Sequence, residues 1–89
     1  MKYGMTLEDF EALLAKQEGV CAACGKPETR LAGRGKLNLK PRPLSVDHNH
    51  TTGEVRGLLC FSCNLALGHL EDNLDRIKAL YRYRKNFGP

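Results

Sequence analysis

The chain has 89 residues, with 14 lysines and arginines against 10 acidic residues, so its formal net charge is +4. This length predicts a single domain over residues 1–89 with a modest core, and four cysteines supply the staple that small domains commonly need. The N-terminal segment lacks the apolar core of a signal peptide, and no stretch approaches the roughly 18 apolar residues of a membrane span. We therefore expect an intracellular protein with reduced thiols and no membrane contact, and its basic charge favours a polyanionic partner.

Residues 7–17 are predicted to form an amphipathic helix. Thr6 and Asp9 have the spacing of a capping box, which satisfies backbone N–H groups at a helix start. The apolar residues that follow recur at helical spacing: Leu7, Phe10, Leu13 and Leu14. Gly19 stands where a glycine commonly ends a helix. We expect the apolar face to pack on the region of the cysteines.

Residues 26–43 are predicted to form a long loop, because they contain prolines and glycines and show no clear periodicity. A loop of this length is unusual in a compact domain and indicates either function or disorder. Against the single acid Glu28, it carries a group of basic residues: Lys26, Arg30, Arg34, Lys36, Lys40 and Arg42. Two interpretations stay open, a solvated mobile loop and a segment that contacts the DNA backbone.

A β-hairpin is predicted between residues 44 and 59. Residues 44–46 form a short strand that runs into Asp47 and His48, and residues 51–53 give a turn signal. Residues 54–59 form the return strand, in which Gly57 suggests a bulge or a close backbone approach. The chain is therefore expected to be a small α+β domain.

Two helices are predicted after the hairpin. A short one begins at Asn64, runs to Leu67, and is ended or interrupted by Gly68. A longer one covers roughly residues 74–86, and Asp72 and Asn73 can cap its start.

The four cysteines form two Cys-x-x-Cys pairs, Cys21 with Cys24 and Cys60 with Cys63. Two such pairs complete the tetrahedral thiolate set of a structural zinc, although residues 25–59 make the spacing longer than usual. The main alternative, a thioredoxin-like redox motif, needs a βαβ context that this chain lacks. A closed four-cysteine site has no open position, so this zinc is expected to fold the domain rather than to catalyse.

Asp47, His48 and Asn64 are candidates for a second, catalytic site. A carboxylate is a hard oxygen donor suited to Mg²⁺, and a largely neutral histidine can take a proton from water. Neighbours on a strand point to opposite faces, so both serve one site only if the backbone leaves the strand near Asp47. Asn64 follows a zinc ligand at once, near a helix start that favours a phosphate.

The same residues also have purely structural interpretations. Asn64 on its own is explained as a helix cap, and Asp47 with His48 as a hydrogen-bonded turn pair. His50 is left between a phosphate contact and a supporting role, and His69 is assigned to the surface. The combination of an acid-histidine pair beside a hairpin with Cys-x-x-Cys-Asn downstream is what favours a site.

At these residues the chain resembles the recombination endonuclease VII family of phages, within the HNH (ββα-metal) nucleases. The resemblance covers residues 6 to about 74 and rests on the first cysteine pair, on Asp47-His48-Asn49-His50, on Thr52-Gly53-Glu54-Val55-Arg56-Gly57-Leu58-Leu59-Cys60 and on Cys63-Asn64. It implies a hairpin and a helix around a four-cysteine zinc, with flanking helices.

The resemblance also implies an activity, namely metal-dependent hydrolysis of DNA phosphodiester bonds that leaves 5′-phosphate and 3′-hydroxyl ends. Asp47 and Asn64 match the family's ligands for catalytic Mg²⁺ or Mn²⁺, His48 its general base, and His50 a histidine near the scissile phosphate. Arg56 and the basic loop would hold the DNA backbone without reading sequence. A phage- or prophage-encoded protein acting in the host cytoplasm is implied.

The family's junction resolvase continues into helices that build an intertwined dimer, whereas this chain stops after one short helix. Nicking or cutting of ordinary DNA by a monomer is therefore expected, with a dimer left open. Two other hypotheses are a zinc-stabilised DNA-binding module without catalysis and an accessory subunit of a larger nuclease or packaging complex. The binding module explains the cysteines and the basic charge but gives no reason for the placement of Asp47, His48 and Asn64.

Overall fold

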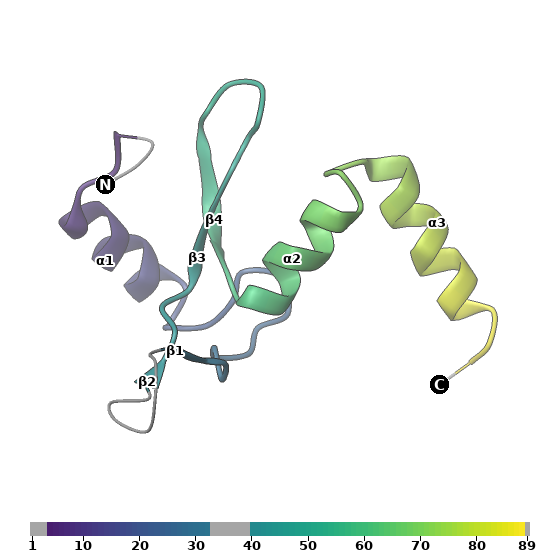
Figure 1. Cartoon of the computed structure of the whole chain (residues 1–89), viewed down its shortest axis with the longest axis horizontal. Helices are drawn as coiled ribbons and strands as arrows, with labels where there is room; N and C mark the ends of the chain where they lie inside the picture. The colour runs from purple at the N-terminus through teal and green to yellow at the C-terminus, as the bar shows by residue number, and fades with distance from the viewer. Residues whose placement is uncertain (1–3, 33–39, 89) are drawn as a thin grey trace.

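The computed structural model describes residues 4–32 and 40–88 and has the small α+β architecture expected (Figure 1). Its elements in chain order are α1 (Leu7–Lys16), β1 (Leu31–Ala32), β2 (Lys40–Pro41), β3 (Ser45–His48), β4 (Val55–Leu59), α2 (Phe61–His69) and α3 (Leu74–Lys85). In Figure 1 the β3–β4 hairpin stands between α1 and α2, and α3 lies beyond α2. No helix in the described parts of the chain is long and apolar enough to cross a membrane.

Helix α1 forms as predicted, and its capping box is complete. The Thr6 hydroxyl accepts from the backbone N–H of Asp9 at 3.0 Å, and the Asp9 carboxylate accepts from the backbone N–H of Thr6 at 3.0 Å. Gly19 follows the helix in the left-handed region, with φ of 75°. The apolar face packs on the core through three half-buried side chains, Phe10, Leu13 and Leu14.

Gln17, just past the end of α1, ties this helix to the hairpin. Its side-chain oxygen accepts from the backbone N–H of Leu58 at 3.0 Å. Its amide nitrogen donates to the carbonyl of Leu58 at 3.0 Å and to that of Val20 at 2.9 Å. Leu58 is fully buried, so Gln17 supplies hydrogen bonds where water does not reach.

The predicted hairpin is confirmed, with β3 antiparallel to β4. The register pairs Asp47 with Gly57 but His48 with Val55, so Arg56 is an extra residue on β4. An irregularity of this kind bends the strand and re-aims side chains, and it lies where we expect the backbone to leave the regular strand. Gly57 is buried, and a Cβ there would meet the Gln17 side chain at 3.5 Å. The predicted bulge is therefore found directly beside Gly57, whereas a close backbone approach at Gly57 is not, because a Cβ there would make only ordinary van der Waals contact with side chains.

The core is small and lies where the hairpin meets the cysteines. Its buried members are Cys21, Leu44, Leu58, Leu59 and Cys60, with Val46, Cys63 and Leu67 packed against them beside α1. The apolar core and the cysteine cluster are thus one structure.

Helix α2 differs from its prediction at both ends. It begins at Phe61 rather than at Asn64, because the Cys60 sulfur acts as the N-cap and accepts from the backbone N–H of Cys63. It also passes through Gly68 to His69, since one glycine costs a helix only about 1 kcal/mol. Asn64 therefore lies in the first turn of α2.

The turn from α2 to α3 contains two non-glycine residues in the left-handed region, Glu71 with φ of 57° and Asp72 with φ of 54°. Helix α3 then begins as predicted at Leu74, and Asn73 alone caps it by accepting from the backbone N–H of Arg76 at 3.0 Å. The carboxylate of Asp72, expected to share the capping role, binds elsewhere.

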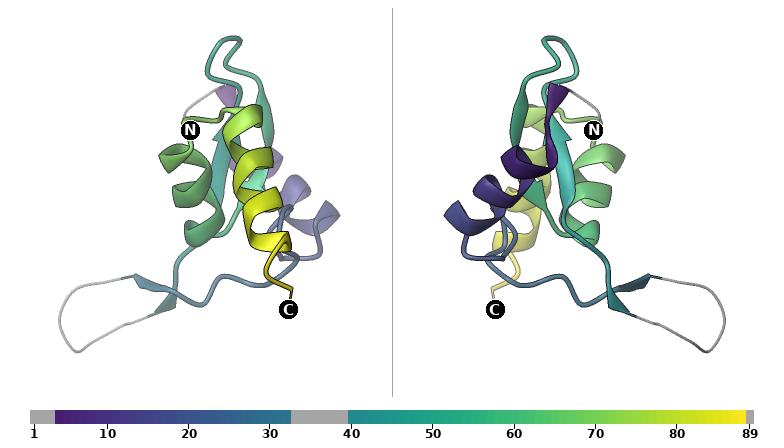
Figure 2. Two further views of the ribbon diagram at one scale, coloured as in Figure 1. Left: turned by 90° about the vertical axis from the view of Figure 1, so that its right-hand side faces the viewer. Right: turned by 90° about the vertical axis from the view of Figure 1, so that its left-hand side faces the viewer.

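The stretch predicted as a long loop contains a short ribbon, in which Leu31 pairs with Pro41 and Ala32 with Lys40. In both views of Figure 2 the ribbon lies at the opposite end of the molecule from the turn between β3 and β4. Residues 33–39, with Arg34 and Lys36, lie outside the described residues.

Candidate metal centre and adjoining pocket

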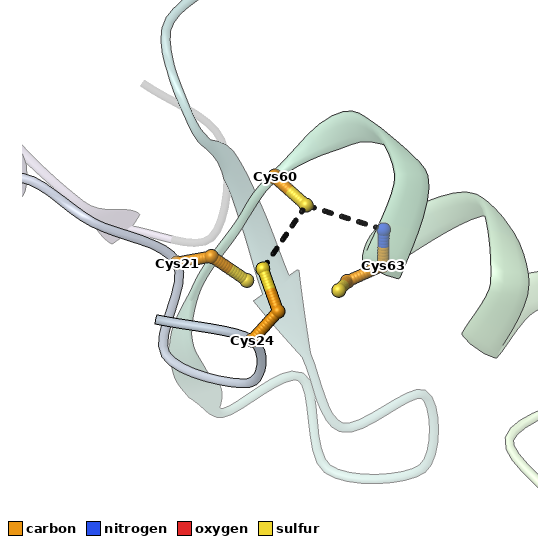
Figure 3. A group of neighbouring side chains, drawn as sticks. All are labelled: Cys21, Cys24, Cys60 and Cys63. Atoms are coloured by element: carbon orange, nitrogen blue, oxygen red, sulfur yellow. Dashed lines mark hydrogen bonds between the residues drawn. The ribbon is translucent and has the colours of Figure 1, made fainter. Parts of the chain in front are cut away.

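The four cysteines converge on one point (Figure 3). Cys21 and Cys24 come from the turn after α1, whereas Cys60 and Cys63 come from the junction of β4 and α2. Their sulfur atoms all lie within 4.8 Å of one another. A tetrahedral zinc with Zn–S bonds of about 2.3 Å needs sulfurs about 3.8 Å apart, and the sulfurs of Cys24 and Cys60 are 3.9 Å apart.

The ionisation of these thiols also favours a bound cation. Burial alone would raise the pKa of Cys21, but backbone N–H groups of Cys24, Cys60 and Ala23 bring it down to about 6. Burial and hydrogen bonds with the neighbouring thiols raise the pKa of Cys63 to about 12. Packed sulfurs cannot all ionise without a counter-charge, and a divalent ion supplies it. The donor set therefore fits a structural zinc.

A polar pocket adjoins this centre and brings together all four predicted catalytic residues. Asp47 and His48 from β3, His50 from the following turn and Asn64 from α2 line one cavity of about 560 Å³. The rings of His48 and His50 are in contact, with centroids 4.6 Å apart. The rest of the lining comes from β3, the turn, α2 and the turn after it: Val46, Thr51, Leu67, Gly68, Glu71 and Asp72.

The position of Asn64 in this pocket follows from the cysteine centre. Cys60 and Cys63 hold the start of α2 against the hairpin, and Asn64 directly follows Cys63 in the first turn. Asp47 reaches the same cavity because β3 and β4 are irregular at this point. The pocket is thus assembled from segments that the cysteines and the hairpin register place together.

Arg56, predicted to hold DNA, is engaged within the protein. Its Nε and Nη2 donate to the two oxygens of Asp47 at 2.8 and 2.9 Å. Its Nη1 donates to the two oxygens of Asp72 at 3.2 and 3.1 Å. Hydrogen bonds to Asp47 and then to Asp72 raise the pKa of Arg56 above its ordinary value.

Two of the other basic residues flank the start of α2. The guanidinium groups of Arg30 and Arg42 lie 4.3 and 4.7 Å from the ring centroid of Phe61. The Glu28 carboxylate accepts from the backbone N–H groups of Phe61 and Arg30, and these two bonds, Phe61 first, lower its pKa. Lys40 is the first residue of β2. These contacts fix the ends of the basic stretch on α2.

Sequence reasoning missed Asp72 and Glu71 as pocket residues. The only signal they offered was two consecutive acids after a glycine-containing helix, and an acid at that place is more simply explained as a cap. It also missed the bond from Gln17 to Leu58, which spans 41 positions.

The fold and these two features define a small α+β domain that is organised on a cluster of four cysteines able to hold a metal ion and that carries a polar pocket beside it. The chain belongs to the recombination endonuclease VII family, whose model matches residues 1–86.

Two phage proteins are similar to it over most of its length. The gene 59 protein of Mycobacterium phage D29 is 38% identical over 82 residues, which is 91% of this chain and 44% of that protein. The gene 59 protein of Mycobacterium phage L5 is 36% identical over 85 residues, which is 94% of this chain and 46% of that protein. The chain thus spans less than half the length of these relatives. No solved structure matches it.

Proposed function

We propose that this chain is a metal-dependent DNA endonuclease of the HNH (ββα-metal) type that acts in phage recombination. The observation that carries the proposal is the single pocket lined by Asp47, His48, His50 and Asn64 beside the cysteine centre. Membership of the endonuclease VII family supports a nuclease role and DNA as the substrate. The cysteine centre would hold zinc and keep the pocket assembled.

Asp47 and Asn64 are the proposed ligands of the catalytic ion. A carboxylate and an amide oxygen are donors that Mg²⁺ and Mn²⁺ accept, and Mg²⁺ retains several of its waters, so two protein ligands suffice. When bound, the ion would neutralise charge on the phosphoryl and leaving oxygens. Within the described residues, the four cysteines are the one group of three or more His, Cys, Asp or Glu side chains that are close enough to share an ion. The donors of the pocket therefore fit a single catalytic ion better than a two-ion clamp.

His48 is the proposed general base. A neutral imidazole can remove a proton from the attacking water near neutral pH, while the water attacks phosphorus and the bond to the 3′-oxygen breaks. His50, in ring contact with His48, stands where it can contact the scissile phosphate. Hydrolysis thus uses the two histidines for proton transfer and substrate positioning.

The basic residues at the ends of the 26–43 stretch are the proposed DNA contacts. Arg30 and Arg42 place two guanidinium groups against Phe61 at the start of α2. Such groups bind phosphates without reading bases. Arg34, Lys36 and Lys40 are further basic residues of the same stretch of sequence and are proposed to contact DNA in the same way. Low sequence specificity follows from this kind of contact.

Plasmid nicking by the purified protein, with and without Mg²⁺ or Mn²⁺, tests the proposal. His48→Ala is the test variant, and His69→Ala, at the end of α2, is the matched control; each is used at equal zinc content. We expect ion-dependent nicking that falls at least 100-fold in His48→Ala and persists in His69→Ala. Nicking that survives in His48→Ala refutes the assigned base. No nicking on supercoiled, linear or branched DNA refutes autonomous catalysis and favours the binding module or the accessory subunit.

A further inference from the structure

The contact between Arg56, Asp47 and Asp72 joins a proposed ion ligand to a residue of the α2–α3 turn. One guanidinium serves two carboxylates, and each carboxylate accepts with both of its oxygens. The Asp47 side chain is only 12% exposed, whereas those of Asp72 and Arg56 are 32% and 35% exposed. Bidentate contacts of this kind fix orientation as well as adding energy.

Arg56 reaches Asp47 from outside the pocket. Asp47 and Asp72 both belong to the pocket lining, but Arg56 does not. A carboxylate offers about four lone-pair sites on its two oxygens, and the Arg56 fork uses one on each. Asp47 therefore keeps acceptor capacity for an ion on the pocket side while Arg56 holds its plane.

The charge of the cluster decides how well it attracts a cation. Asp47 and Arg56 alone form a neutral pair, which is a poor ligand for a divalent ion. Adding Asp72 brings the cluster of three to a net charge of −1. Glu71, the other acid of the turn, is paired with Arg76 at 2.8 Å and so does not offset the charge of Arg56.

Resting on the proposed ion site at Asp47 and Asn64, we propose that Asp72 is a positioning residue for the catalytic ion. It anchors Arg56, which orients Asp47, and it offsets the positive charge that Arg56 brings to the site. Partners of ligating side chains commonly contribute 10–100-fold to metal affinity, so an effect of about tenfold is expected.

A purely structural role for Asp72 makes a different prediction. If the pair with Arg56 only tied the α2–α3 turn to the hairpin, its loss would lower stability and leave ion affinity unchanged. Asp72→Asn separates the two, because asparagine tolerates the left-handed backbone that Asp72 adopts and so preserves the turn. Asp75→Asn is the matched control, since it makes the same change at an exposed residue in the first turn of α3 that is not part of the pocket lining.

The experiment measures Mn²⁺ binding to the zinc-loaded chain by electron paramagnetic resonance, with zinc content and thermal melting as checks of folding. We expect Asp72→Asn to weaken Mn²⁺ binding about tenfold and Asp75→Asn to change it less than threefold. The double variant Arg56→Gln/Asp72→Asn should bind Mn²⁺ more tightly than Asp72→Asn alone, because the uncompensated positive charge has also been removed. This recovery of binding is a result that a structural role does not give.

Equal Mn²⁺ affinity in the wild type and Asp72→Asn overturns the inference. Equal losses in Asp72→Asn and Asp75→Asn overturn it as well, as does a double variant that binds Mn²⁺ no more tightly than Asp72→Asn. A wild type that binds no Mn²⁺ overturns both the inference and the proposed ion site. A wild type that binds Mn²⁺ with the expected pattern but does not nick DNA refutes the proposed activity and leaves the inference standing. If the wild type nicks DNA and Asp72→Asn binds Mn²⁺ with unchanged affinity, the proposed activity stands and the inference is refuted.

Discussion

Replacing Gln17 by methionine should destabilise the domain, although Gln17 lies outside both proposed sites. Methionine has nearly the same shape but neither donates nor accepts a strong hydrogen bond. The backbone N–H of Leu58 would lose its acceptor, at 3.0 Å in the structure, in a residue with no exposed surface. The carbonyl of Leu58 would keep one donor, because the backbone N–H of Ala22 also reaches it at 3.0 Å.

The expected loss follows from that count. A buried donor left without a partner costs about 1–3 kcal/mol, and the lost bonds to the carbonyls of Leu58 and Val20 add up to about 1 kcal/mol each. We expect Gln17→Met to lower the free energy of unfolding by about 1–5 kcal/mol. Small domains have only about 5–15 kcal/mol in total, so the change is large.

Urea unfolding of the zinc-loaded protein measures this loss, with Lys16→Met as the control. Lys16 is the exposed neighbour on α1, so the same methionine there should change stability by less than about 0.5 kcal/mol. Hydrogen exchange at the Leu58 amide gives a second reading, since its protection should fall in Gln17→Met. Equal stability of the two variants, with Leu58 still protected, would refute the claim that Gln17 alone satisfies this buried group.

Two further predictions concern the metal centre and pH. Cys60→Ser should abolish stoichiometric zinc binding and cooperative melting, because a structural zinc contributes roughly 10 kcal/mol or more to folding. Ser62→Ala, a substitution between Cys60 and Cys63, should keep both. A native melting curve of Cys60→Ser would disprove a structural metal. Glu28→Gln should lower the urea midpoint at pH 7, since hydrogen bonds from Phe61 and then Arg30 lower the pKa of Glu28 in the folded state. A lowered pKa stabilises the fold above the ordinary glutamate pKa of about 4.3, so the difference between wild type and variant should vanish as the pH falls through the folded-state value; a difference independent of pH would contradict this.

The elements that could be predicted are those whose signals are local. The capping box at Thr6, the turn before Glu54 and the two cysteine pairs each occupy a few consecutive residues. The pocket could be predicted because the hairpin fixes where Asp47 lies and the second Cys-x-x-Cys pair fixes where Asn64 lies. Their proposed roles go beyond the placement itself and rest on the family resemblance.

The features that could not be predicted depend on contacts between distant residues. Nothing near Cys60 shows that its sulfur caps α2, since cysteine is an uncommon N-cap, so the helix start was placed three residues late. The pairing of Arg56 with Asp72 spans 16 positions and needs a left-handed backbone that aspartate rarely adopts. Long-range bonds of this kind are set by the assembled fold rather than by local preference.

The distance along the chain between the two cysteine pairs bears on how the molecule is made. Cys24 and Cys60 are 36 positions apart, and the core contains Cys21 and Cys60, one cysteine of each pair. A growing chain that has not yet reached Cys60 therefore has two thiols but no tetrahedral set, and α1 has no hairpin on which to pack. The core and the pocket therefore have to form together, once the second cysteine pair has been made.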